Sequence, residues 1–307
     1  MGNQVQLEWA TERILAASWS FIDLWISYSS NWKKSTGRIK FVRLSSEQIG
    51  EFFEQGWTVL PQLFSPDEIS VARRAFERLY VKAQQLRTTQ DHDGTHFVLD
   101  APPVGDVIVK RIVWAGGTEP DLLSLSADPR LVDSALQLLG GDQCEQLLCQ
   151  AHFKMPKDGV SFDWHQDVQH RDKGPGTWSD LNGLGSYVQT IMLIDDMNDY
   201  NGPLKFIPRS AVSDQGQIRL SSDSYDYSTP MKSVPAPALF DESKAVTVTS
   251  AAGSVVFFGP YAIHGSTSND SSVPRRVLIN GYAYPGANGR VYPGRGSSRT
   301  LTRNAYG

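Results

Sequence analysis

The stretch that decides both the fold and the chemistry expected of this chain reads Phe162-Asp163-Trp164-His165-Gln166-Asp167. His165 and Asp167 stand two positions apart, so on an extended strand or an open turn their side chains point the same way and can hold one metal ion between them. A histidine and a carboxylate at this spacing also arise by chance in many proteins. The pair therefore predicts a metal site only in combination with a third ligand further along the chain.

The best candidate for the third ligand is His264, in the segment Tyr261-Ala262-Ile263-His264-Gly265-Ser266. Two histidines and one carboxylate on one face of an ion, with open positions opposite, are typical of non-heme Fe(II) oxygenases. Histidine and carboxylate ligands also suit zinc, so a zinc hydrolase stays open at this point. A metal-binding module of the cupin type, without redox chemistry, stays open as well.

An anchor for a second small molecule follows in Pro274-Arg275-Arg276-Val277-Leu278-Ile279. Read as a strand, this segment places Arg275 on the face of Val277 and Ile279, whereas Arg276 belongs to the opposite face. A guanidinium on an apolar face needs an anion, and its planar fork grips a carboxylate through two parallel hydrogen bonds. The distal carboxylate of 2-oxoglutarate would fit there. Neither the zinc hydrolase nor the cupin-type module accounts for Arg275.

With these residues the chain resembles the phytanoyl-CoA dioxygenase family, whose bacterial members include ectoine hydroxylase. The resemblance runs from about residue 44 to about residue 284 and is carried by Trp164-His165-Gln166-Asp167, by the segment 201–210, by His264-Gly265-Ser266 and by Pro274-Arg275. One departure is Arg209-Ser210-Ala211, where the family usually has a Gly-Ser-His ending. The first 43 residues and the tail also lie outside the common pattern.

The resemblance implies a fold, a set of cofactors and a reaction. It implies that Fe(II) is held by His165, Asp167 and His264, and that 2-oxoglutarate is held by Arg275, Ser266 and Lys110. With O2 as the oxidant, the expected reaction is hydroxylation of an aliphatic C–H bond of a small molecule, in specialised or amino-acid-type metabolism. Desaturation or ring closure by the same oxidant stays open, and the substrate itself is not predicted.

Four further residues are candidates for contact with the substrate: Gln169, His170, Trp178 and His152. The first three follow the proposed metal ligands closely, so their side chains can reach the space above the open coordination positions. Trp178 offers a broad apolar face and one indole donor, which suits either a substrate or loop packing. His152 lies on a predicted strand whose polar face also carries Gln150 and Lys154, and it suits either the site or a structural hydrogen bond.

The predicted fold is mainly β with flanking helices, a double-stranded β-helix of the jelly-roll, cupin-like kind. Its strands are expected at 57–60, 107–110, 147–154, 187–194, 204–207, 245–249, 254–258 and 277–283. Helices are expected after the capping boxes at Ser45 and Ser65 and after Asp128. The predicted division is an N-terminal helical extension (1–43), an oxygenase domain (44–285) and a C-terminal tail (286–307). The tail suits either a solvated terminus or a segment that folds over the site, where its arginines could meet an anionic substrate. The segment 91–96 is expected to form an exposed turn rather than a metal site.

Charge and cysteine content limit the partners and the location. Lys and Arg total 29 against 33 Asp and Glu, and no basic block occurs, so no nucleic-acid partner is expected. Cys144 and Cys149 form neither a plausible disulfide nor a zinc knuckle, which favours a cytoplasmic location. The predicted helix over 7–31 is interrupted by charge and too short in its apolar core to span a bilayer. It is expected to pack on the domain or on a second copy of the chain, which leaves a homo-oligomer open.

Overall fold

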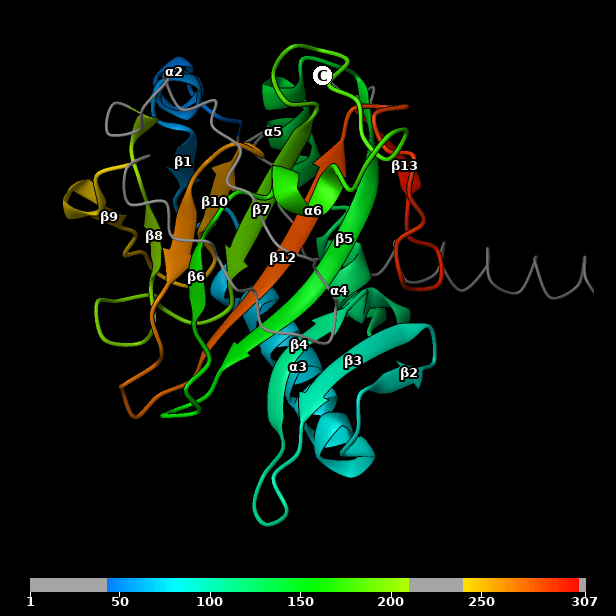
Figure 1. Ribbon diagram of the computed structural model, residues 1–307, viewed down its shortest axis with the longest axis vertical. Helices are drawn as coiled ribbons and strands as arrows, with labels where there is room; N and C mark the ends of the chain where they lie inside the picture. Colours follow the sequence, from blue (N-terminus) through cyan, green and yellow to red (C-terminus); the bar gives the residue numbers. More distant parts are fainter. Residues whose placement is uncertain (1–42, 210–239, 304–307) are drawn as a thin grey trace, which may run out of the picture. The chain divides into compact units, whose positions relative to one another are not determined.

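Two antiparallel sheets form the framework of the computed structural model, which describes residues 43–209 and 240–303 (Figure 1). The larger sheet has the strand order β1 (Trp57–Leu60), β10 (Val255–Phe258), β7 (Tyr187–Leu193), β12 (Arg275–Ala283), β5 (Gln143–Lys154), β4 (Ile108–Val113), β3 (Thr95–Asp100) and β2 (Gln90–His92), and β13 (Arg299–Thr302) pairs with β5. The smaller sheet has the order β6 (Phe162–His165), β11 (His264–Ser266), β8 (Leu204–Phe206) and β9 (Val246–Thr247).

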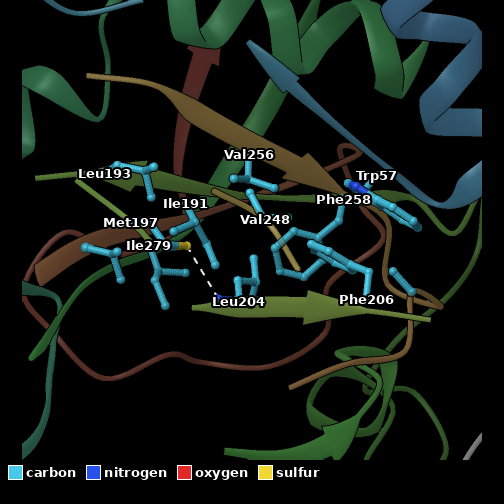
Figure 2. Close-up of a cluster of buried hydrophobic side chains, with 12 residues drawn as sticks. Trp57, Ile191, Leu193, Met197, Leu204, Phe206, Val248, Val256, Phe258 and Ile279 are labelled. Atoms are coloured by element: carbon cyan, nitrogen blue, oxygen red, sulfur yellow. Dashed lines mark hydrogen bonds between the residues drawn. The ribbon is translucent and has the colours of Figure 1, made fainter. Parts of the chain in front are cut away.

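The two sheets pack face to face through a cluster of buried apolar side chains (Figure 2). Trp57 of β1 stacks on Phe206 of β8, with ring centroids 4.8 Å apart and planes only 4° from parallel. Val277 and Ile279 of β12 belong to the same cluster, and so does Leu204 of β8. This contact between the inner faces confirms the predicted double-stranded β-helix.

Five α-helices of the described residues flank the sheets: α2 (Ser46–Gln55), α3 (Pro66–Leu86), α4 (Pro120–Leu125), α5 (Pro129–Leu139) and α6 (Val168–Arg171), with 3-10 turns η1 (Ala115–Gly117) and η4 (Glu242–Lys244). Both predicted capping boxes are present, between Ser45 and Gln48 and between Ser65 and Glu68. Asp128 caps α5, which ends at Gly140 in the left-handed conformation that favours glycine. In the described residues, no helix combines the length and apolarity that a membrane span requires.

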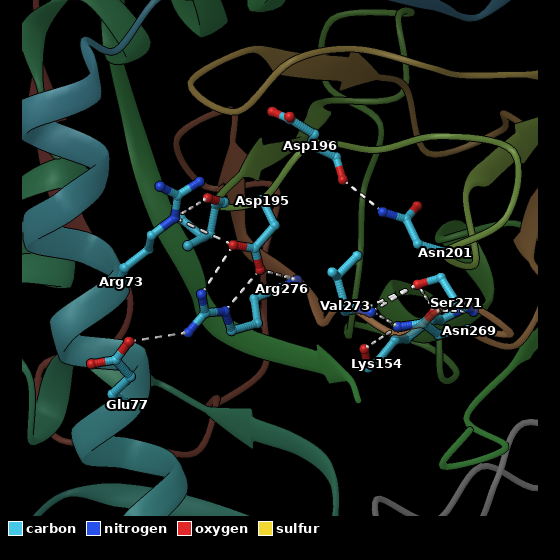
Figure 3. A network of polar contacts seen from close by, with 11 residues as sticks. Arg73, Glu77, Lys154, Asp195, Asp196, Asn201, Asn269, Ser271, Val273 and Arg276 are labelled. Atoms are coloured by element: carbon cyan, nitrogen blue, oxygen red, sulfur yellow. Dashed lines mark hydrogen bonds and ion pairs between the residues drawn. The ribbon is translucent and has the colours of Figure 1, made fainter. Parts of the chain in front are cut away.

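An ion-pair network ties α3 to the outer face of the larger sheet (Figure 3). Asp195 accepts hydrogen bonds from Arg276 Nε at 2.8 Å and from Arg73 Nε of α3 at 3.3 Å. Arg276 Nη1 also lies 3.9 Å from Glu77 Oε1. Arg276 therefore points away from the interior that its neighbour Arg275 faces, as the strand pattern predicts.

Residues 91–96 contain the expected turn, at Asp93-Gly94 where both φ angles are positive, and it joins β2 to β3 as a hairpin in which His96 Nδ1 lies 2.7 Å from Asp91 Oδ1. Of the two alternatives for the tail, the structure does not support a solvated terminus, because β13 pairs with β5 and Tyr292 is buried and lines the cavity. The predicted helix over 7–31 lies outside the described residues, and so does most of the long loop that a content rich in Ser, Asp, Tyr and Pro predicts over 210–242.

Candidate metal and cosubstrate site

Three potential metal ligands converge where the smaller sheet meets α6. His165 ends β6 and His264 begins β11, and the two residues are directly opposite in the antiparallel pair. Asp167 stands two residues after His165, at the N-cap position of α6, where its side chain makes no capping hydrogen bond. The ligand atoms of His165, Asp167 and His264 all lie within 4.8 Å of one another, and all three residues are buried. In the part of the chain that the structure describes, this is the sole cluster of such residues with metal-ligand spacing.

The backbone fixes which nitrogen each histidine can offer. His165 Nδ1 lies 2.6 Å from the carbonyl oxygen of Asp163, and His264 Nδ1 lies 3.0 Å from that of Ala262. A carbonyl only accepts, so each Nδ1 carries the proton and donates it. Both Nε2 atoms are then unprotonated and available to a metal, the usual arrangement for metal-ligating histidines.

The ionisation of these groups suits a metal ion. Burial, followed by the influence of His264, lowers the pKa of His165 to about 3, and burial lowers the pKa of His264 to about 4, so both rings are neutral. Burial raises the pKa of Asp167. One of its carboxylate oxygens, Oδ2, is buried with no hydrogen-bond partner. A cation held between the three side chains would compensate this carboxylate, so the residues fit a divalent metal.

A second group of polar residues lies at the β12 end of the same cavity. Arg275 is 5% exposed, its Nη2 donates to the carbonyl of Gly202, and its Nε is buried without a partner. Burial lowers the pKa of this guanidinium to about 10. Ser266 lines the cavity beside it and accepts a hydrogen bond from Lys154 Nζ at 2.7 Å. The arrangement presents unpaired donors to an anion.

The structure does not bring Lys110 to this cavity. Lys110 lies on the other face of β4, where its Nζ is 3.3 Å from Asp100 Oδ2 and its side chain is 36% exposed. Its neighbour Arg111 faces the cavity instead, because successive strand residues alternate in direction. The buried lysine near Arg275 is Lys154, at the end of the polar face that Gln150 and His152 begin. That alternation was the signal that could have identified it.

The four substrate candidates divide into two pairs. His152 and His170 line the cavity, and His170 lies beside His165 with ring centroids 5.8 Å apart. Gln169 does not line it, and its Oε1 accepts a hydrogen bond from the backbone of Gln166. Trp178 packs away from it, edge-on to Tyr187 at 5.9 Å. For Trp178 the structure favours the loop-packing alternative.

The cavity that connects these groups is open to solvent and encloses about 100 Å³. Sequence reasoning missed several of its polar lining residues: Arg111, Gln150, Arg171, Gln189 and Tyr292. Arg171 and Tyr292 could not be paired from the sequence, because one lies on α6 and the other in the C-terminal segment.

The double-stranded β-helix and its cluster of two histidines and one carboxylate define the class of 2-oxoglutarate-dependent oxygenases. The family model for phytanoyl-CoA dioxygenase (PhyH) matches residues 52–277, and the chain belongs to that family. An ectoine dioxygenase from Bordetella parapertussis is 29% identical over 248 residues, which are 78% of this chain and 75% of that protein. The L-proline trans-4-hydroxylase of Streptomyces griseoviridis is 27% identical over 244 residues, 74% of this chain and 82% of that protein.

Solved structures show the same fold. EctD from S. alaskensis, crystallised with 2-oxoglutarate and 5-hydroxyectoine, superposes with a TM-score of 0.62 at 22% identity, covering 88% of this chain and 90% of that one. The carbocyclase SnoK from nogalamycin biosynthesis gives a TM-score of 0.59 at 19% identity, covering 87% and 100%. The predicted family, fold and enzyme class, an Fe(II)- and 2-oxoglutarate-dependent dioxygenase, are thereby confirmed.

Proposed function

We propose that the protein hydroxylates an aliphatic C–H bond of a small molecule, with Fe(II) held by His165, Asp167 and His264. The observation that carries this assignment is the convergence of their three buried ligand atoms within 4.8 Å. The buried, unpartnered Oδ2 of Asp167 supports it, since a metal cation would compensate that atom. The names of the relatives, an ectoine dioxygenase and a proline hydroxylase, favour a small polar substrate.

We assign the cosubstrate to the end of the cavity that Arg275 lines. The guanidinium of Arg275 would hold the distal carboxylate of 2-oxoglutarate through two parallel hydrogen bonds. The hydroxyl of Ser266 and the amine of Lys154, which are 2.7 Å apart, would supply further donors to the same carboxylate. Lys154 takes the place that the sequence resemblance gave to Lys110.

The chain's own contribution to the reaction is to position the metal, the cosubstrate and the substrate and to enclose them in the cavity. Bound iron and 2-oxoglutarate supply the oxidising chemistry when O2 reacts with them, leaving succinate and carbon dioxide. His165 and His264 stay in one tautomer because their Nδ1 atoms donate to backbone carbonyls. Apolar side chains of the cavity wall, Ile191, Met197, Leu204, Val277 and Ile279, exclude water from the space in which the substrate lies.

The test is consumption of 2-oxoglutarate by purified protein. Iron is added anaerobically, O2 is admitted, and succinate is measured with and without candidate substrates. Asp167→Asn keeps the shape of the side chain but removes its charge, so succinate formation should be lost. Asp199→Asn alters an exposed carboxylate away from the cavity and should leave it unchanged. Wild-type protein that forms no succinate under any condition would contradict the proposal.

Desaturation and ring closure use the same cofactors and are separated from hydroxylation by the mass of the product. Hydroxylation adds one oxygen to the substrate, whereas desaturation and ring closure each remove two hydrogens. Mass spectrometry over a panel of candidate metabolites therefore identifies the outcome together with the substrate.

The proposal also covers the location of the protein, its division into segments and its self-association. We propose a cytoplasmic location, which is supported by Cys144 and Cys149, both buried and unpaired. We also keep the division into an extension (1–43), a domain (44–285) and a tail (286–307), and self-association through the segment 7–31. Light scattering of the full chain beside a form lacking residues 1–43 tests the self-association, which requires that only the full chain be oligomeric.

A further inference from the structure

The cavity contains a buried cation that the iron and cosubstrate sites do not use. Arg171, the last residue of α6, lines the cavity and is only 4% exposed. Within residues 43–209 and 240–303, no carboxylate forms an ion pair with it. Its Nε atom is buried and has no hydrogen-bond partner. The charge of Asp167 acts on this guanidinium from a distance, but the two side chains form no ion pair, so a buried donor of Arg171 stays open to an anion.

Two tyrosines hold this guanidinium in place without neutralising it. Its Cζ lies 4.6 Å from the ring centroid of Tyr187 and 5.2 Å from that of Tyr292. Arg171 Nη1 donates to the Tyr292 hydroxyl at 2.6 Å. The Tyr187 hydroxyl in turn donates to Gln189 Oε1 at 2.5 Å. Aromatic rings stabilise a nearby cation, and the hydrogen bond to Tyr292 holds the guanidinium in place, so its remaining donors are preorganised for a ligand.

The charges around the cavity point to an anion on the substrate side. Its lining residues include three arginines, Arg111, Arg171 and Arg275, and one carboxylate, Asp167. A divalent iron and Arg275 together carry as much positive charge as Asp167 and the 2-oxoglutarate dianion carry negative charge. The charges of Arg111 and Arg171 are then not balanced by the metal and the cosubstrate, so the cavity stays positive where the substrate would lie, and Arg171 is the one of the two that follows the iron ligand Asp167 on α6.

We propose that Arg171 binds a carboxylate of the substrate, so that the enzyme acts on small carboxylic acids, amino acids included. This inference rests on the proposed function, because it places the acid beside the iron ligands. Arg171 stands four residues after Asp167, one helical turn away and on the same face, about 6 Å along the helix axis. The carbon to be oxidised therefore lies a few bonds from the carboxylate.

The first test needs no variant. Wild-type protein with Fe(II) and saturating 2-oxoglutarate is titrated anaerobically with matched pairs: L-proline and L-prolinamide, then cyclohexanecarboxylate and cyclohexanecarboxamide. We expect the carboxylate of each pair to bind at least about tenfold more tightly than the amide, because one charge-assisted hydrogen bond contributes about that factor in affinity. Equal binding within the pairs, or no binding by any member, would overturn the proposal. Tighter binding of cyclohexylphosphonate would overturn the choice of a carboxylate.

The second test locates the anion. Arg171→Gln should abolish the preference for carboxylates, and Arg171→Lys should retain part of it, because the charge remains while the fork is lost. Arg74→Gln, at an exposed arginine of α3, should retain all of it. Persistence of the full preference in folded Arg171→Gln protein would refute the assignment. Displacement of labelled 2-oxoglutarate by the carboxylates would also refute it, since they would then occupy the Arg275 end.

Failure of the anion subsite and failure of the proposed function give different experimental results. Succinate formation is measured on the same preparations. A preference for carboxylates without any succinate formation would contradict the proposed function and leave the anion subsite standing. Succinate formation without the preference would contradict the anion subsite alone.

Discussion

His165 and His264 face each other across a single pair of strands, at directly opposed positions of β6 and β11, with ring centroids 4.1 Å apart. Each ring is anchored by its Nδ1 to the backbone carbonyl two residues earlier. The sheet itself thus sets the distance and orientation of two ligands far apart in sequence. Asp167 joins them from the N-cap position of α6, so a substitution of any of the three residues should weaken metal binding.

The first prediction concerns the metal. Asp167→Ala and His264→Ala should each lower 2-oxoglutarate turnover by roughly a hundredfold or more, since even residues that only orient a ligand cost 10- to 100-fold. In Asp167→Ala the affinity for Fe(II) should fall by a smaller factor than the turnover does, because two histidines and the chelating cosubstrate remain. Anaerobic metal titration and succinate assays measure the two effects. Full activity in His264→Ala would refute the assignment of the triad.

The second prediction concerns the cosubstrate anchor. Arg275→Lys keeps the charge but loses the fork, so the affinity for 2-oxoglutarate should fall about tenfold, or roughly 1.4 kcal/mol. Isothermal titration against the iron-loaded protein, without O2, gives the dissociation constant.

Arg276→Lys is the matched control, because Arg276 is the next residue and points to the opposite face. It should leave the affinity for 2-oxoglutarate unchanged and lower the melting temperature, since two hydrogen bonds from its guanidinium to Asp195 are lost. If Arg276→Lys weakened 2-oxoglutarate binding more than Arg275→Lys did, the assignment of the anchor would be wrong.

The third prediction is a pH dependence at Lys154. Burial, followed by the charge of Arg275, lowers its pKa to about 6 in the free protein, so the amine is largely neutral above that pH. A bound 2-oxoglutarate dianion stabilises the protonated form and raises this pKa, so binding should take up a proton at about pH 7 to 8. The complex then holds more protons than the free protein, and affinity should decrease as the pH rises through this window.

Calorimetry in two buffers of different ionisation enthalpy measures the proton uptake. Lys154→Met should remove it, whereas Lys157→Met, at an exposed lysine nearby, should retain it. Binding without proton uptake in the wild type would show that Lys154 does not contact the cosubstrate.

The sequence predicted the parts of this site that follow from local spacing. Alternation along one strand was enough to separate Arg275 from Arg276, and the structure places them on opposite faces of β12. The spacing of His165 and Asp167 indicated a shared direction, although Asp167 lies at the start of α6 rather than on the strand. The starts of the helices could also be predicted from local sequence, because a capping box is complete within four residues.

Parts that depend on packing between distant segments were not predictable. Lys110 and Arg111 are adjacent, and only the direction of β4 relative to β5 decides which of them faces the cavity. For the tail, rich in glycine and arginine, the sequence left open a solvated terminus and a segment folded over the site. Its β13 strand nevertheless pairs with β5, a contact that no local pattern encodes.

The fourth prediction concerns Trp178, which the sequence left open between substrate contact and packing. Trp178 is 9% exposed and belongs to a buried cluster with Leu147, Leu148, Tyr187, Ala283, Ala287 and Tyr292. Trp178→Ala leaves a cavity in that cluster and should lower the free energy of unfolding by about 3 kcal/mol, as measured by denaturant titration. Trp178→Phe retains an aromatic ring, so its free energy of unfolding should fall by less than that of Trp178→Ala.

Iron binding in the folded Trp178→Ala protein should be unchanged, because Trp178 does not line the cavity. The ratio of product formed to 2-oxoglutarate consumed should also stay at the wild-type value. A residue that contacts the substrate would behave in the opposite way, with stability intact and 2-oxoglutarate consumed without product. That result would return Trp178 to the substrate site and require the segment around it to move when the substrate binds.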